Sequence, residues 1–161
     1  MLAEPPPEPI RSKPTGNPNR DLLRLISDHH ASVILMTHAI AETAESAAAG
    51  AEARMLEEEH DHELEQVAAS LQGRFHASYL GQASVESRFV AGSVRSRPSE
   101  DHAEIFALNT IRAESSLVAA IDELLPKVSD APTRELAVGI SHNHRRALAR
   151  LKKVFKKFLV R

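Results

Sequence analysis

Four long stretches of the chain each carry an apolar stripe, and a histidine or glutamate interrupts every stripe. Apolar residues recur in them at alternating steps of three and four, the spacing that places side chains on one face of an α-helix. Glu114 stands where a core residue is expected on the third stripe, and His144 does so on the fourth. A charge inside packed helices is costly unless it is paired or binds a metal. The interruptions are therefore candidate functional positions.

The composition suits tightly packed helices. Hydrophobic residues make up 42% of the chain, aromatic residues only 4%, and tryptophan is absent, so the core must consist of Leu, Ile, Val and Ala. Glycine is scarce in the long stretches, and no run alternates with the period of two that is typical of strands. The sequence predicts an all-α fold: an antiparallel, up-down-up-down four-helix bundle with a short helix between the second and third long helices.

Prolines, glycines and capping residues divide the chain. Residues 1–18 hold six prolines and predict a disordered tail, and residues 19–161 predict the bundle. The expected long helices run from about Asn19 to Ala49, from about Glu52 to His76, and from a cap at Ser99 to about Leu125. Pro126, Asp130 and Pro132 mark the next connection, and the fourth helix runs from there to near the C-terminus. Asn17 or Asn19 caps the first helix, and Gly50 supplies its turn. The short helix is expected within residues 77–98.

Several function classes are excluded or disfavoured. Without cysteine the chain forms no disulfide, thiolate zinc site or iron–sulfur cluster. The N-terminus lacks the pattern of a signal peptide, and no apolar run approaches the ~20 residues of a membrane span, so a cytoplasmic location is expected. The net charge of −2 argues against nucleic acid as the main partner. No nucleophile elbow or phosphate loop is present, so an enzyme is not expected.

Distance from each predicted turn gives the height of a residue along the bundle. His38 and His62 lie about twelve residues from the turn at Gly50, or ~18 Å. Glu114 and His144 lie about fifteen residues from the second turn, or ~22 Å. If both turns are at the same end, these residues and Glu63 converge on one interior site. His29 and His30 lie ~12 Å from the His38 level and are expected to form a separate polar pair.

The pattern of carboxylates and histidines resembles the ferritin-like superfamily, and is closest to its small bacterial families of unknown function. Those bundles carry a Glu on helices one and three and Glu-x-x-His on helices two and four. Glu59 and His62 match the motif on the second helix, Glu114 supplies the third, and His144 keeps the histidine of the fourth. The resemblance implies a metal site, whose candidate ligands are His38, Glu59, His62, Glu63, Glu114 and His144.

Two of the four family carboxylates are replaced in this chain, which favours nitrogen ligands over a di-iron pair. A transition metal ion is therefore expected, with Zn, Ni, Cu and Fe as candidates, and no metal is the alternative. Glu114 pairing with a neighbouring Arg or His is the ordinary structural interpretation. A weak likeness between the two halves suggests an internal duplication. The hemerythrin bundle is a lower-ranked alternative, because its His-x-x-x-His pair is missing here.

The C-terminal stretch is basic and amphipathic. Its cations are Arg145, Arg146, Arg150, Lys152, Lys153, Lys156, Lys157 and Arg161, interleaved with apolar residues. The ordinary interpretation is the last core helix with solvated lysines. A partial overhang that binds an anionic partner is the prediction that goes further. The alternative function for the whole chain is a helical scaffold or interaction module that uses this end or the proline-rich tail, and a homo-oligomer is compatible with either function.

Overall fold

The computed structural model describes residues 14–98 and 101–159, and these residues form helices and connecting segments without any strand. The elements are α1 (Pro18–Thr43), α2 (Ala47–Phe75), α3 (Val85–Ser96), α4 (His102–Leu124), the short 3₁₀ helix η2 (Leu125–Lys127), α5 (Ala131–Val154) and α6 (Lys156–Leu159). The all-α prediction is confirmed. Most of the proline-rich tail (1–13), the predicted Ser99 cap and Arg161 lie outside the described residues.

Local capping explains where α1, α2 and α5 begin. The Asn17 side chain accepts hydrogen bonds from the next residues' backbone N–H groups, and Pro18 occupies the first helical position, which needs no N–H donor. Asp130 caps α5 in the same way, through the backbone N–H of Thr133. Ser46 caps α2 by accepting from the backbone N–H of Ala49.

The turn between the first two long helices is not where the sequence placed it. α1 ends at Thr43 and α2 already begins at Ala47, so Gly50 lies inside α2. The prediction of a turn at Gly50 was wrong because a serine cap at Ser46 starts the helix before an alanine-rich segment. The predicted extent of the second helix therefore moves by five residues at its start, while its end near His76 is correct.

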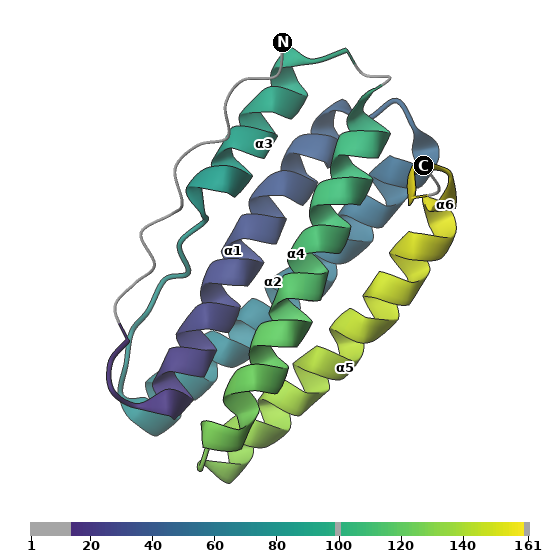
Figure 1. The fold of residues 1–161 in the computed structure, drawn as a ribbon. Helices are drawn as coiled ribbons and strands as arrows, with labels where there is room; N and C mark the ends of the chain where they lie inside the picture. The colour runs from purple at the N-terminus through teal and green to yellow at the C-terminus, as the bar shows by residue number, and fades with distance from the viewer. Residues whose placement is uncertain (1–13, 99–100, 160–161) are drawn as a thin grey trace.

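Contacts between distant segments fix the directions of the long helices. Asn19, at the start of α1, accepts from the backbone N–H of Asp130, which caps α5. Arg74, at the end of α2, also pairs with Asp130. The His102 ring at the start of α4 lies 3.3 Å from the carbonyl of Thr43 at the end of α1. The directions are thus up for α1, down for α2, down for α4 and up for α5 (Figure 1).

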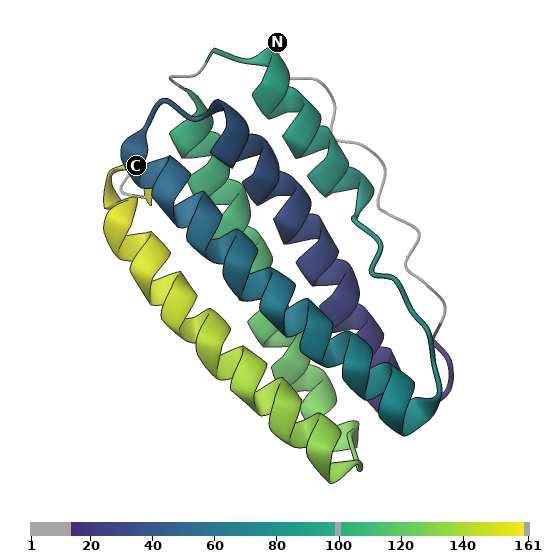
Figure 2. The same cartoon turned by 180° about the vertical axis from the view of Figure 1, so that it is seen from behind.

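The predicted up-down-up-down order is therefore corrected, and the two helix turns lie at opposite ends. The cause is the crossover between α2 and α4, in which the chain climbs back along α1 and continues into α3 (Figures 1 and 2). Asp28 on α1 accepts hydrogen bonds from the Tyr79 hydroxyl and the Gln82 backbone in this segment. A Cβ added at Gly81 would lie 2.2 Å from the carbonyl oxygen of Ser27, so the segment approaches α1 as closely as only glycine allows.

A layer of polar side chains divides the buried core in two. One apolar cluster, which includes Leu56 and Phe106, lies toward the α1–α2 turn, and the other, which includes Leu71 and Ile121, lies toward the α4–α5 turn. Between them lies what we call the polar layer, which consists of His29, His30, His60, Glu63, Glu114 and His144.

The basic C-terminal stretch ends on the bundle. α5 stops at Val154, and the ring of Phe155 is buried, 5.8 Å from the ring of Phe106. Phe158 packs against the same apolar cluster, whereas Leu159 is 40% exposed. Phe155 and Phe158 thus attach this end of the chain to the core, while Lys156 and Lys157 are exposed. Binding of an anionic partner stays a prediction. None of the helices formed by the described residues has the length and apolar character to cross a membrane.

Candidate metal centre

The polar layer is built at the middle of the four long helices. His30 on α1, His60 and Glu63 on α2, Glu114 on α4 and His144 on α5 each lie within about two residues of the midpoint of their helix. All five are buried. Because the midpoint of a helix keeps its level when the helix is reversed, helix direction does not affect whether these side chains meet.

His30 and His60 are held in the same way, each by its own helix. The Nδ1 of His30 lies 2.8 Å from the carbonyl of Ile26, and the Nδ1 of His60 lies 2.7 Å from the carbonyl of Leu56. A backbone carbonyl can only accept, so Nδ1 carries the hydrogen in both rings. In the neutral ring the lone pair is then on Nε2, and this atom points into the layer.

Each of these lone pairs faces a carboxylate. Nε2 of His30 lies 2.7 Å from Oε2 of Glu63, and Nε2 of His60 lies 2.9 Å from Oε1 of Glu114. A neutral Nε2 and a carboxylate oxygen are both acceptors and repel each other at this distance. Each contact therefore needs a shared proton or a nearby cation.

His144 links the two carboxylates. Its Nδ1 contacts Oε2 of Glu114, and its Nε2 lies 2.8 Å from Oε2 of Glu63. Asn143, the preceding residue, donates from its amide to the other oxygen of Glu63 at 3.0 Å. The α5 side of the layer is thus a hydrogen-bonded chain from Glu114 through His144 to Glu63.

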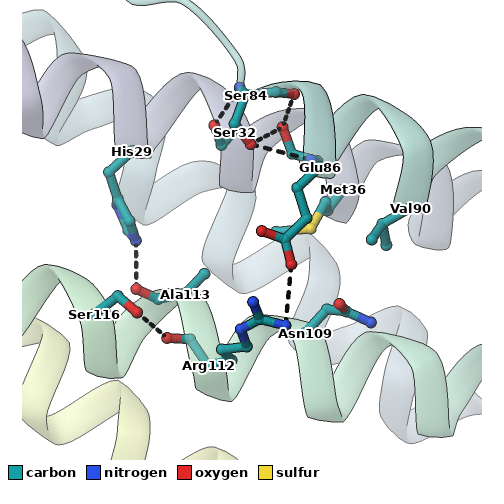
Figure 3. Close-up of a pocket in the computed structure, with 11 residues that line it drawn as sticks. His29, Ser32, Met36, Ser84, Glu86, Val90, Asn109, Arg112, Ala113 and Ser116 are labelled. Atoms are coloured by element: carbon teal, nitrogen blue, oxygen red, sulfur yellow. Dashed lines mark hydrogen bonds and ion pairs between the residues drawn. The ribbon is translucent and has the colours of Figure 1, made fainter. Parts of the chain in front are cut away.

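His29 completes the layer at its edge. Its Nε2–H donates to the carbonyl of Ala113 at 3.0 Å and lies 3.7 Å from Oε1 of Glu114. Its ring centre is 5.8 Å from that of His60 and 5.6 Å from that of His144. The side chain is 12% exposed, more than any other histidine of the layer. Figure 3 shows the ring between α1 and α4, with the bond to Ala113 dashed.

The electrostatics follow from burial and pairing. Burial opposes the charged form of His144, but hydrogen bonds to Glu114 and Glu63 outweigh it and raise its pKa to about 9. Burial alone would raise the pKa of both carboxyls, yet the hydrogen bonds from the histidines hold each below its usual range. Burial lowers the pKa of His29 and of His30. The imidazolium of His144 thus lies between the two ionised carboxylates.

The layer contains two overlapping sets of ligand atoms. One atom each from His30, His60 and His144 lie within 4.8 Å of one another, and the same holds for His29, His60 and Glu114. Ligand atoms on one tetrahedral ion are about 3.4 Å apart, given metal–nitrogen bonds of about 2.0–2.1 Å, so these atoms are at most about 1.4 Å farther apart than one ion requires. A cavity of about 10 Å³ lies against His60, Glu63, Glu114 and His144, close to the smallest that holds one water or ion.

The structure brings together only part of the predicted ligand set. Glu63, Glu114 and His144 belong to the polar layer. His38 is exposed and pairs with Glu42 and Glu57. Glu59 and His62 are also exposed, and Glu59 contacts Arg150.

The motif that carried the ferritin-like resemblance therefore lies outside the layer: His62 is exposed, and Glu59 only lines the small cavity beside the layer. The inward residues of α2 are His60 and Glu63, in the reverse order to Glu-x-x-His, and α1 contributes His29 and His30 in place of a glutamate. These residues do not fit a di-iron carboxylate centre. They form a site with four imidazoles and two carboxylates.

Sequence reasoning missed His29, His30 and His60, although His30 and His60 lie on the stripes. The heights were measured from Gly50, which puts His38 and His62 level. Measured from the real turn at residues 44–46, His30 and His60 are equally distant, at about fifteen residues each. The serine cap at Ser46 was the signal that could have found them.

No protein-family model, curated protein or solved structure matches the chain.

Proposed function

We propose that this chain is a metal-binding helical bundle protein that holds one divalent transition metal ion in its polar layer. Ring nitrogens of His30, His60 and His144 are the primary ligands, and a carboxylate oxygen of Glu63 or Glu114 completes the set. The observation that carries the proposal is the orientation of His30 and His60. Each ring is fixed by a hydrogen bond from Nδ1 to the backbone, which leaves Nε2 to bind a metal, the usual outer-shell arrangement of metal-binding histidines.

The chemistry of the ligands selects the ion. Imidazole nitrogen suits Zn, Ni, Cu and Fe, whereas Mg and Ca prefer sites made of oxygen alone. Three buried imidazoles with one carboxylate suit a tetrahedral Zn²⁺. The ferritin-like relationship remains part of the proposal, supported by the single crossover in the bundle, which that superfamily also has. Its di-iron chemistry is not part of it.

The test uses protein expressed without a histidine tag, stripped with a chelator and titrated with Zn²⁺ by calorimetry, with Co²⁺ absorption to report coordination. We expect one ion per chain. His60→Gln should weaken binding by more than about 100-fold, because loss of an outer-shell partner alone costs about 10- to 100-fold. The matched control is His62→Gln, two residues away and exposed, which should bind like the wild type. His144→Gln and the exposed His142→Gln form a second such pair.

Two results would contradict the proposal. Wild-type protein that takes up no Zn²⁺, Ni²⁺ or Cu²⁺ would leave a metal-free scaffold as the function. Two equivalents of iron per chain would instead indicate the di-iron centre of the superfamily. A metal-free scaffold is the second candidate function, because His144 contacts both carboxylates and gives them hydrogen-bond partners without any ion.

A further inference from the structure

One pocket of the molecule opens toward the polar layer. It has a volume of about 220 Å³ and lies between α1, α3 and α4. His29 forms part of its wall, and so do Met36, Glu86, Asn109 and Ser116 (Figure 3). Hydroxyls, an amide, a carboxylate, a thioether and the guanidinium of Arg112 thus line a space large enough for several water molecules.

His29 is the contact between this pocket and the buried ligands. It lines the pocket, and the same ring lies within 6 Å, centre to centre, of the rings of His30, His60 and His144. A ring nitrogen of His29 also lies within 4.8 Å of ligand atoms of His60 and Glu114. Binding of a cation through Nε2 would replace the hydrogen bond to Ala113. A cation that leaves water in the pocket therefore meets His29 before it meets the buried histidines.

The opposite side of the layer is closed more tightly. The cavity there measures only about 10 Å³. Asn143 covers Glu63 with a hydrogen bond of 3.0 Å, and Arg150 pairs with Glu52 and Glu59 nearby. An ion arriving from that side would have to displace these contacts.

The part of the pocket wall between α3 and α4 is polar, and one exposed ion pair joins the two helices there. Glu86 on α3 pairs with Arg112 on α4 at 3.0 Å, and both side chains are exposed, so the pair adds little stability. On release from Arg112, the Glu86 carboxylate would offer oxygen atoms to a hydrated divalent cation at the outer part of the pocket.

We propose that the pocket between α1, α3 and α4 is the route by which a hydrated divalent transition metal ion reaches the polar layer, with His29 as the first protein ligand it meets. The inference rests on the proposed function, since it needs a metal to bind. It assigns His29 a transient role, distinct from the resident role of His30, His60 and His144.

The test is to narrow the pocket without touching the layer. Ser116→Phe places a ring in the pocket, whereas Ser115→Phe places the same ring on the exposed face of the same helix. Stopped-flow absorption of Co²⁺ measures uptake, and transfer to a chelator measures release. A blocked route slows both directions equally, so Ser116→Phe should reduce both rates by about tenfold or more with an unchanged Kd. Ser115→Phe should match the wild type.

A second pair of variants tests the same route in case Ser116→Phe does not fold. Asn109→Phe narrows the pocket from α4, and Leu108→Phe, at a 43% exposed position outside it, is its control. Circular dichroism checks the fold of all four variants. His29→Ala should slow the uptake of Co²⁺, because it removes the first ligand on the route.

The outcomes separate the two proposals. If Co²⁺ and Zn²⁺ bind, but both pocket variants load as fast as their controls, the route is wrong and metal binding stands. A large loss of equilibrium affinity in His29→Ala, with unchanged uptake, would make His29 a resident ligand and overturn its transient role. If the wild type binds neither ion in the equilibrium titration, both proposals fail together.

Discussion

His30 and His60 each commit one ring nitrogen to the carbonyl four residues earlier in the same helix. The backbone therefore decides which nitrogen faces the interior, and a rotation of either ring would break a buried hydrogen bond. Metal-binding histidines are generally oriented in this way, and outer-shell bonds of this kind tune the affinity of the site. In this chain the carbonyls belong to regular α-helix, so the orientation comes with the fold.

His144 should make the metal-free protein less stable as the pH rises above neutral. Its pKa is about 9 in the folded chain and 6.5 in the unfolded chain, so the folded state retains a proton that the unfolded state has lost. Its contribution is complete below about pH 6.5 and is lost as the pH rises through 9. Urea unfolding with a chelator present should show the free energy of unfolding falling in this window, by at most about 1.4 kcal/mol per pH unit.

His144→Gln should remove this alkaline slope, and the exposed His142→Gln should keep it. Below pH 6.5 a different loss is expected, because burial lowers the pKa of His29 and His30 and their protons are then bound more readily by the unfolded chain. A wild-type protein whose stability stays level between pH 6.5 and 9 would contradict the assignment of a bridging imidazolium.

At the scale of elements, the starts of the first and the last long helix were predicted better than the connections between helices. Asn17 with Pro18, and Asp130 with Pro132, form local signals that need no tertiary information, and both helices begin there. Gly50 was misleading because a glycine, although it disfavours a helix by about 1 kcal/mol relative to alanine, is tolerated here among alanines that favour the helix. Glu114 and His144 were identified because a polar residue within an apolar stripe can be recognised in the sequence itself. Which side chains lie beside it depends on where the helices turn, and that was predicted wrongly.

Gly81 controls how the crossover segment sits on α1. Gly81→Ala would bring Cβ within 2.2 Å of the Ser27 carbonyl, and that oxygen belongs to helix backbone that cannot yield. Crowding of this kind costs about 1–3 kcal/mol, which should appear as a lower urea midpoint. Gly73→Ala is the control, since its Cβ would meet nothing within 4 Å, and it should be neutral or stabilising. Equal destabilisation by both variants would show that the close approach does not matter.

At the scale of the whole molecule, the order of helix directions could not be predicted from the sequence. Short turns predict that α1 with α2, and α4 with α5, form hairpins, but the direction of α4 depends on the segment from His76 to Asp101. That segment has no stripe long enough to reveal that it climbs the full length of α1. The contacts that hold it, such as those of Asp28, join residues more than fifty positions apart.

Truncation after Arg150 should unfold the bundle. It removes Leu151 and Phe155, which are 0% and 2% exposed, and loss of two such core side chains costs roughly 5–10 kcal/mol, comparable to the stability of a whole domain. Truncation after Phe158 keeps both of these buried side chains and should leave the helical circular dichroism and the melting temperature nearly unchanged. A folded protein ending at Arg150 would show that the basic end is an appendage, and binding to anionic vesicles should then be tested on it.

The polar layer also governs how the helices slide past one another. Apolar contacts have no preferred direction, so a core of leucine, isoleucine and alanine gains almost as much from a neighbouring alignment as from the observed one. If α4 slid by one turn, about 5.4 Å, Glu114 would leave His60 and His144 and enter one of the two apolar clusters, at a cost of several kcal/mol. A layer made entirely of leucine would remove that cost and admit the shifted alignments.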